Sequence, residues 1–180
     1  MSDSHAADVL HFWFVEHPND WFVKNPSLDD EIRRRFQPLY EEAAAGRLDA
    51  WLDAARACLA RVILLDQFPR NMFRGAARAF AGDPLARATA RRILERGWDK
   101  SMTPDEQLFA YLPFEHSESL EDQELSCALM QEFDEEQRRY AERHREIIRR
   151  FGRFPHRNGI LGRHSTPAEI EFLQQPGSGF

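Results

Sequence analysis

Three helix start signals constrain the fold of this chain more than any other feature. They are Asp83-Pro84, Thr103-Pro104 and Thr166-Pro167. Asp and Thr side chains accept hydrogen bonds from the first N–H groups of a helix, and proline fits the first helical turn. Each threonine is followed three positions later by a glutamate, which completes a capping box. These signals predict helices that begin near residues 83, 103 and 166.

Apolar residues recur at helical spacing along most of the remaining chain. The predicted helices cover residues 6–16, a segment that starts at Ser27 and kinks or ends near Pro38, residues 48–67 closed by Pro69, residues 83–96 stopped by Gly97, a short segment from 103 to Pro113, residues 120–151 with a break near Asp134, and residues 166–173. No run alternates apolar and polar residues between turns, so we expect no sheet. The prediction is an all-α single domain of seven to nine helices over residues 1–175, with a frayed tail at 176–180.

Composition narrows the class of protein. The net charge of −6 argues against a dedicated nucleic-acid binder, whose affinity comes from neutralising phosphates. No apolar run approaches the ~20 residues that a membrane span needs, and the N-terminus lacks the pattern of a signal peptide. The two cysteines, Cys58 and Cys127, fall in predicted helices and indicate no disulfide framework. We expect a soluble, cytoplasmic protein without nucleic-acid or membrane partners, and its oligomeric state stays open.

Asp66 interrupts an apolar helical face, because it lies three residues after Ile63. An acidic group in the last turn of a helix also opposes the helix dipole, at a cost of roughly 0.3–1 kcal/mol. We therefore expect a cationic partner, either Arg70 or an arginine from later in the chain, and favour a structural ion pair. Gln67, Arg70 and Asn71 add polar groups around the same proline turn.

Histidines mark two further positions. His116, Ser117 and Glu118 are adjacent, which is not by itself a catalytic arrangement because neighbours along a chain do not face each other. His116 is nevertheless a candidate general acid or base, since the ordinary pKa of imidazole lies near neutrality. His144 lies in an apolar helical stripe, where we expect a hydrogen-bonded core residue more than a ligand.

The stretch from Arg149 to Arg163, RRFGRFPHRNGILGR, combines five arginines with two phenylalanines. Its glycines and proline exclude one continuous helix, and the phenylalanines indicate a loop fixed against the helical body. Guanidinium groups bind carboxylates and phosphates through paired hydrogen bonds, so the loop can bind an external anion or pair with internal carboxylates. The candidate residues in the loop are Arg153, His156, Arg157, Asn158 and Arg163.

No sequence motif for a cofactor or a metal is present. A Walker-type loop, a dinucleotide fingerprint, an HExxH helix and a CxxC pair are all missing. His116, His144, His156 and Glu118 could be combined as metal ligands, but their spacing does not support it. We predict neither a metal nor a cofactor.

Several segments resemble a bacterial family, domain-of-unknown-function family nine-twenty-four (DUF924): LLDQFPRNMFRG (64–75), YLPFEHSE (111–118), RFGRFPHRNGILGR (150–163) and STPAEIEFL (165–173). The aromatic residues between 11 and 22 are similar too, so the resemblance covers nearly the whole chain. It implies a single all-helical domain with tetratricopeptide-like packing of helical hairpins, and no established activity, substrate or cofactor. The characteristic polar positions of the family correspond here to Asp66, Gln67, Arg70, Asn71, His116, Ser117, Glu118, His144, Arg153, His156, Arg157, Asn158 and Arg163.

Three functions stay open from the sequence. The first is a pocket for a small carboxylate or phosphate, formed where the stretches 66–71, 116–118 and 153–163 converge, with His116 or His156 moving a proton in acid–base hydrolysis. The second is an interaction module that grips an acidic peptide or a C-terminus. The third is a structural network of ion pairs. We favour the first, expect part of the third in either case, and leave open whether the protein is an enzyme.

Overall fold

The computed structural model describes residues 2–179, and all regular structure in that range is helical. The all-α prediction is confirmed. The described chain divides into two compact units. The first unit contains the chain up to Arg74 together with Arg78–Pro113, and the second contains Gly75–Ala77 and the chain from Phe114 onward. The single domain over 1–175 and the tetratricopeptide-like stacking stay predictions. Among the described helices, none is long and apolar enough to cross a lipid bilayer.

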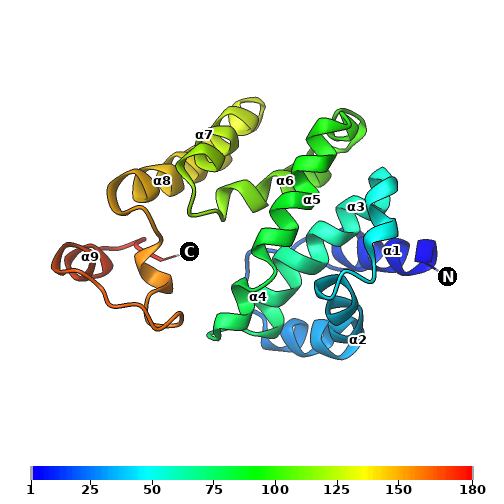
Figure 1. The fold of residues 1–180 in the computed structure, drawn as a ribbon, viewed down its shortest axis with the longest axis horizontal. Helices are drawn as coiled ribbons and strands as arrows, with labels where there is room; N and C mark the ends of the chain where they lie inside the picture. Colours follow the sequence, from blue (N-terminus) through cyan, green and yellow to red (C-terminus); the bar gives the residue numbers. More distant parts are fainter. Residues whose placement is uncertain (1, 180) are drawn as a thin grey trace. The chain divides into compact units, whose positions relative to one another are not determined.

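The first unit is built from packed helix pairs. Helix α3 packs against α1 and α5, and α2 packs against α4 (Figure 1). The elements are α1 (Ser2–His11), the π-helical turn η1 (Phe12–Glu16), α2 (Pro26–Ala44), the 3-10 helix η2 (Asp49–Asp53), α3 (Ala55–Val62), the π-helical turn η3 (Ile63–Gln67), α4 (Phe68–Met72), the 3-10 helices η4 (Ala77–Phe80) and η5 (Trp98–Ser101), α5 (Asp83–Glu95) and α6 (Pro104–Glu115). The division between the units crosses η4 and α6.

Aromatic rings fill the centre of the first unit. The ring of Trp13 contacts Phe68 and Phe109 edge-on, with centroid distances of 5.6 and 5.5 Å. Trp21 lies 4.9 Å from Phe109 and donates its indole N–H to the Trp13 carbonyl, so the loop after η1 is held against the body. Phe22 stacks on Phe109 but remains 69% exposed.

The predicted cap at Ser27 and the predicted end near Pro38 are both wrong, and the alternative of a kink at Pro38 stays a prediction. Asn25, not Ser27, caps α2, because its side chain accepts the N–H of Ser27 and proline follows it in the first turn. Pro38 neither ends α2 nor lies near an end. Phe36 and Tyr40, on either side of it, are both buried. Burial of this face outweighs the ~3 kcal/mol cost of an internal proline.

The predicted helix at 48–67 is interrupted and then extended. Ala54 takes an extended conformation between η2 and α3, which separates them. Pro69 does not close the helix, because it occupies the first turn of α4, where a missing N–H costs no hydrogen bond. The helical path continues to Met72, and Asp66 lies in the π-helical turn before α4.

The second unit contains α7 (Leu120–Leu129), the 3-10 helix η6 (Met130–Glu132), α8 (Glu135–Phe151), the 3-10 helix η7 (Pro155–Arg157) and α9 (Pro167–Leu173). Helices α7 and α8 pack side by side (Figure 1). The predicted break at Asp134 is confirmed, since its carboxylate caps α8. Gly152 ends α8 with a φ of 69°, a conformation that favours glycine.

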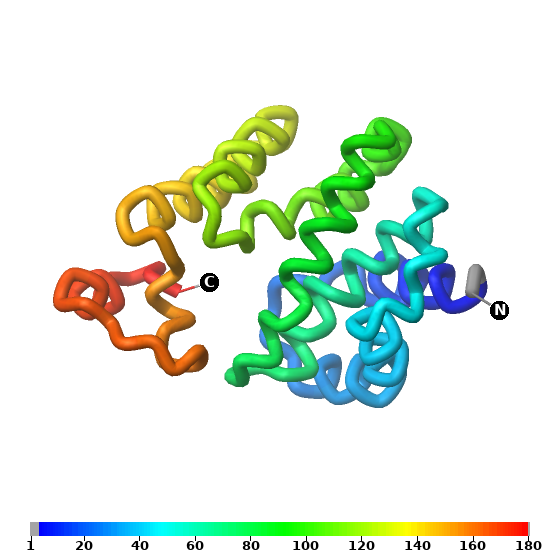
Figure 2. Tube along the Cα trace, viewed as in Figure 1, coloured from blue at the N-terminus to red at the C-terminus, as the bar shows by residue number. Residues whose placement is uncertain are grey.

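The segment after α8 folds back on that helix and leads through η7 to α9 (Figure 2). Phe154 is fully buried with Ile147 and Ile148 of α8, and Phe151 and Phe172 pack against this group. Phe151 is only partly buried, so it does not plug the core as Phe154 does. In the tail, Arg143 donates to the Gly177 carbonyl at 2.8 Å. Residue 180 of the predicted frayed tail lies outside the described residues.

Candidate functional site

Asp66 is fully buried in the first unit and is bound by two of its predicted neighbours. Gln67 donates to its Oδ2 at 2.6 Å, and an Arg70 nitrogen lies 3.3 Å from its Oδ1. Arg70 also donates to both carboxylate oxygens of Asp83, at 2.8 and 3.0 Å. Burial would lower the pKa of Arg70, but the charges of Asp66 and Asp83 outweigh it and raise that pKa. Arg70 is therefore a cationic partner of the kind expected for Asp66.

Asn71 belongs to a separate contact in the same unit. It donates to Asp29 Oδ1 at 2.8 Å, and Arg74 donates to both oxygens of the same carboxylate, at 2.9 Å each. Burial raises the pKa of Asp29, while the bonds from Arg74 and Asn71 more than reverse this and lower it. Sequence reasoning did not identify Asp29, because an acidic residue in the first turn of a helix is already explained by the helix dipole.

In the second unit, Glu118 joins the segment before α7 to the arginine-rich stretch 149–163, which we call the arginine loop. Arg163 donates to Glu118 Oε2 at 2.7 Å and to Oε1 at 2.9 Å, and the Phe154 N–H donates to Oε1 at 2.8 Å. Arg163 also reaches Asn158 Oδ1 at 3.0 Å, and Asn158 donates to Ser165. Burial raises the pKa of Glu118, but these bonds hold it below its ordinary value. Arg163 and Asn158 thus pair internally.

Arg153 is also paired internally. It donates to both oxygens of Glu169, at 2.7 and 2.8 Å, and to the His164 carbonyl. Glu169 accepts the Thr166 N–H as well, which completes the capping box predicted for α9. The Arg153 bond is the main reason that the pKa of Glu169 falls to about 2. The sequence predicted Glu169 only as part of a capping box, and it did not predict the contact with Arg153.

Three predicted polar residues surround the ring of Phe154. The rings of His144 and His156 lie with centroids 5.6 Å from that of Phe154, and the guanidinium carbon of Arg157 lies 4.5 Å from the same centroid. We call these four residues the Phe154 cluster. His144 comes from the middle of α8, whereas the other three come from the loop after it, so folding of the loop assembles the cluster.

The Phe154 cluster holds one guanidinium, with the carboxylates of Glu115 and Glu118 nearby. Burial lowers the pKa of His144 to about 3, although a hydrogen bond to the Tyr140 carbonyl opposes this, and the charges of His116 and Arg157 lower it further. Burial likewise lowers the pKa of His156 to about 4, with Arg157 as the next cause. Both imidazoles are therefore neutral near pH 7, beside a guanidinium.

His116 and Ser117 face different partners. Arg157 donates to the His116 carbonyl at 3.0 Å, which places the histidine backbone beside the Phe154 cluster. Ser117 donates to Asp122 Oδ2 at 2.7 Å, an arrangement that turns a loop into α7 and does not activate a nucleophile. The second unit thus holds eight of the predicted residues, and these are His116, Glu118, His144, Arg153, His156, Arg157, Asn158 and Arg163. The stretch 66–71 belongs to the first unit.

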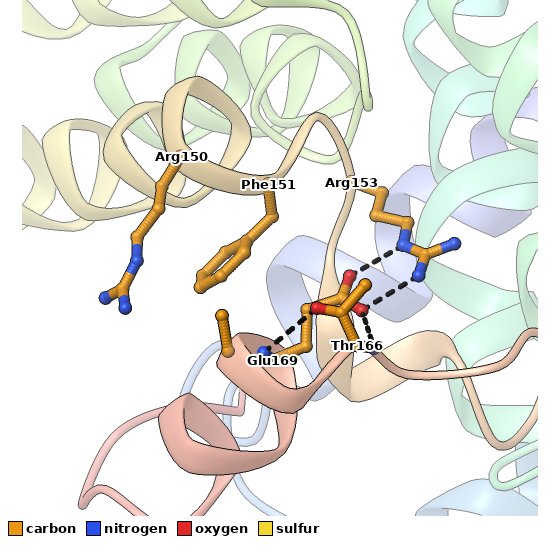
Figure 3. Close-up of a pocket in the computed structure, with 6 residues that line it drawn as sticks. Arg150, Phe151, Arg153, Thr166 and Glu169 are labelled. Atoms are coloured by element: carbon orange, nitrogen blue, oxygen red, sulfur yellow. Dashed lines mark hydrogen bonds and ion pairs between the residues drawn. The ribbon is translucent and has the colours of Figure 1, made fainter.

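A surface pocket of about 480 Å³ lies beside the arginine loop (Figure 3). We call it the Arg150 pocket, and its lining residues are Arg150, Phe151, Arg153, Thr166, Ala168 and Glu169. Figure 3 shows the ring of Phe151 between the side chains of Arg150 and Arg153, with Arg153 bound to Glu169. Sequence reasoning named Arg153 here but not Arg150, because five arginines in one stretch do not reveal which ones pair internally.

Within residues 2–179, one group of His and acidic side chains has the spacing of metal ligands. It consists of Glu16, His17 and Glu31 in the first unit, with ligand atoms within 4.8 Å of one another. Arg35 donates to Glu16 at 2.7 Å and to Glu31 at 3.3 Å, so a positive charge already sits between the carboxylates. The histidines of the second unit form no such group with Glu118 in the described range.

Comparisons with known proteins identify the family and the fold. Residues 9–177 match the family described as "Bacterial protein of unknown function (DUF924)". A solved structure, a protein of unknown function, ATU0120, from Agrobacterium tumefaciens, is 44% identical in sequence with a TM-score of 0.93, and the match covers 97% of this chain and 99% of that one. A search of the curated proteins found no match. This chain belongs to the DUF924 family of bacterial proteins of unknown function.

Proposed function

We propose that the second unit binds a small anion, a carboxylate or a phosphate, at the Phe154 cluster. The observation that carries the proposal is the convergence of His144, His156 and Arg157 on one buried ring, at 5.6, 5.6 and 4.5 Å. These side chains offer nitrogen donors of the kind that recognise oxyanions. His156 is partly exposed, which provides access from solvent.

The positive charge of Arg157 would favour an anion, whereas the carboxylates of Glu115 and Glu118 oppose one. Arg153 and Arg163 each form paired bonds with a glutamate, which makes them framework for the loop. Arg157 donates to the His116 carbonyl, and its charge also lowers the pKa of both nearby histidines. An anion placed there would offset this charge and stabilise the protonated imidazoles. Binding should therefore take up protons and strengthen as the pH falls.

The pKa of His156 limits the catalytic role that this residue could have. With a pKa of about 4, His156 is neutral near pH 7, so it is in the form that accepts a proton, and so low a pKa makes it a weak base. Acid–base hydrolysis at this site would accordingly use His156 as the base. Binding without turnover needs no such step, and it is the function that we propose first.

Isothermal titration calorimetry with sulfate, whose charge is constant at neutral and mildly acidic pH, tests the proposal. We expect saturable binding that strengthens in mild acid. Arg157→Gln and the partly exposed His156→Gln should each weaken it about tenfold or more, as expected for losing a charged or polar hydrogen bond. Arg139→Gln, an exposed change elsewhere on α8, is the control and should leave affinity unchanged.

Two results would contradict anion binding at this cluster. One is the absence of saturable sulfate binding, and the other is unchanged affinity in both variants while their thermal transitions match the parent protein. A peptide ending in acidic residues forms a second arm of the titration. Much tighter binding of that peptide than of sulfate, with the same dependence on Arg157, would assign the site to an interaction module.

We also propose a cytoplasmic location. Cys58 and Cys127 are both free and buried, which fits a reducing compartment. Burial raises the pKa of both thiols, so neither is primed for disulfide exchange. Cell fractionation with antibody detection tests the location, and recovery outside the cytoplasmic fraction would contradict it.

A further inference from the structure

We propose that the Arg150 pocket is a second binding site, specific for a small carboxylate that carries an apolar group. Its volume of about 480 Å³ suits a compact organic molecule, since ligand pockets span roughly 300–1,000 Å³. The site is separate from the Phe154 cluster, and none of its lining residues belongs to that cluster.

Arg150 supplies the charge that would recognise the ligand. Its side chain is exposed, and its guanidinium carbon lies 4.6 Å from the centroid of Phe151 and 5.9 Å from that of Phe172. No carboxylate in the described chain pairs with it. Contact with aromatic rings leaves the N–H donors of a guanidinium for a carboxylate, which they can bind in a two-pronged manner.

The other charges of the pocket cancel. Arg153 binds both oxygens of Glu169, and the same carboxylate accepts the Thr166 N–H. Arg150 therefore sets the net charge of the lining at one positive unit. A single positive charge matches a monoanionic carboxylate better than a phosphate dianion.

Phe151 and Ala168 form the apolar part of the lining, and they decide the rest of the ligand. The ring of Phe151 forms one wall next to Arg150 (Figure 3). Ala168 of α9 adds a methyl group to the lining. Phe151 is only partly buried, so part of its surface faces solvent. A flat apolar body can cover that surface and gain from ring stacking while its carboxylate reaches Arg150.

An NMR titration of the full chain with three probes tests this proposal. Benzoate carries both required features, acetate lacks the apolar body, and benzamide lacks the charge. We expect saturable shifts with benzoate for the amides of residues 150–153 and 166–169, and much weaker shifts of these same amides with the other two probes. Arg150→Gln should weaken benzoate binding about tenfold or more.

Arg149→Gln is the matched control. Arg149 is the preceding residue of α8 and is also exposed, but it pairs with Glu124 at 2.9 Å and does not line the pocket. This variant should bind benzoate as the parent protein does. Arg157→Gln should also leave the benzoate shifts of residues 150–153 and 166–169 intact, which separates a failure of this proposal from a failure of anion binding at the Phe154 cluster.

Three outcomes would overturn the inference. Benzamide could bind as tightly as benzoate, Arg150→Gln could retain the parent affinity, or the shifts could spread over the surface without a centre at the pocket. Inorganic phosphate binding here more tightly than benzoate, with the same dependence on Arg150, would also overturn the assignment to an apolar carboxylate.

Discussion

Arg163 grips Glu118 through two hydrogen bonds, of 2.7 and 2.9 Å, while the N–H of Phe154 donates to the same carboxylate at 2.8 Å. The Glu118 carboxylate therefore binds the arginine loop at two points, the side chain of Arg163 and the backbone N–H of Phe154. Both charged side chains are about one quarter exposed, at 24% and 28%, so solvent screens the pair only in part. The composition of the loop suggested ligand binding, but Arg163 instead helps to fix the loop to Glu118.

Replacing Glu118 with Ala should lower the free energy of unfolding by about 2 kcal/mol, because it leaves a backbone N–H and a guanidinium without their acceptor. Arg163→Ala should cost less, since the Phe154 N–H keeps its bond. A double-mutant cycle measured by urea denaturation should give a coupling of about 1 kcal/mol between the two residues. Strictly additive losses would show that the pair contributes nothing to stability.

Arg70→Ala should destabilise the protein by about 3–5 kcal/mol, because it leaves the buried Asp66 without this cation and breaks two bonds to Asp83. Arg70→Lys should recover part of the loss but not the two-pronged contact. Arg34→Ala is the control, since that side chain is 73% exposed, and it should change stability by about 0.5 kcal/mol or less. Equal effects at Arg70 and Arg34 in thermal unfolding would contradict a role for the Asp66 contact.

Phe154→Ala and Phe151→Ala compare two aromatic residues three positions apart. Phe154 is fully buried, so its truncation should cost about 3–5 kcal/mol by opening a cavity. Phe151 is only partly buried, and its truncation should cost roughly 1–2 kcal/mol. Chemical denaturation measures both, and a larger loss at Phe151 would show that the loop core is centred elsewhere.

His144 should make the fold sensitive to mild acid. Its pKa is about 3 when folded and near 6.5 in an unfolded chain, so below that value the unfolded state binds the proton and the native state does not. Stability should therefore fall as the pH drops, by about 2 kcal/mol for this residue between about pH 6.5 and 5. Glu115, 3.3 Å from the ring, and the nearby His116, His156 and Arg157 all face it.

His144→Gln separates this effect from the titration of carboxylates. The variant keeps a hydrogen-bonding side chain but cannot titrate, so its unfolding midpoint should depend less on pH than that of the parent in mild acid. Glu169, with a pKa of about 2, acts only at lower pH, because its stabilising effect is lost as the pH falls from the ordinary glutamate range toward that value. An unchanged pH profile in His144→Gln would mean that His144 titrates equally in both states.

Local signals predicted much of the secondary structure. The capping boxes at Thr103 and Thr166, the stop at Gly97 and the break at Asp134 all occur where the residues themselves place them. Such features depend on hydrogen bonds between residues a few positions apart, so a single sequence contains them. The errors include the cap at Ser27, the unpredicted break at Ala54, and the ends expected near Pro38 and at Pro69. At the two prolines, packing and position within a turn overrode the usual effect of proline.

The site was less predictable, because its contacts join residues that are far apart in the sequence. The polar residues could be named, but Arg153 and Arg163 have partners 16 and 45 positions away, Glu169 and Glu118. Arg150 carries no such pair, although it belongs to the same arginine-rich stretch. Residue type and spacing do not encode this difference, because it depends on which carboxylates the folded loop meets.

The sequence by itself determined that this chain is all-α, where most of its helices begin and end, and that it belongs to DUF924. The tertiary structure decided which arginines pair with carboxylates of the described chain, as Arg153 and Arg163 do, and which do not, as with Arg150. Helix boundaries arise from short-range hydrogen bonding and periodic apolar faces. The state of each charge is a long-range property, since burial and the nearest opposite charge set it only after the chain has folded.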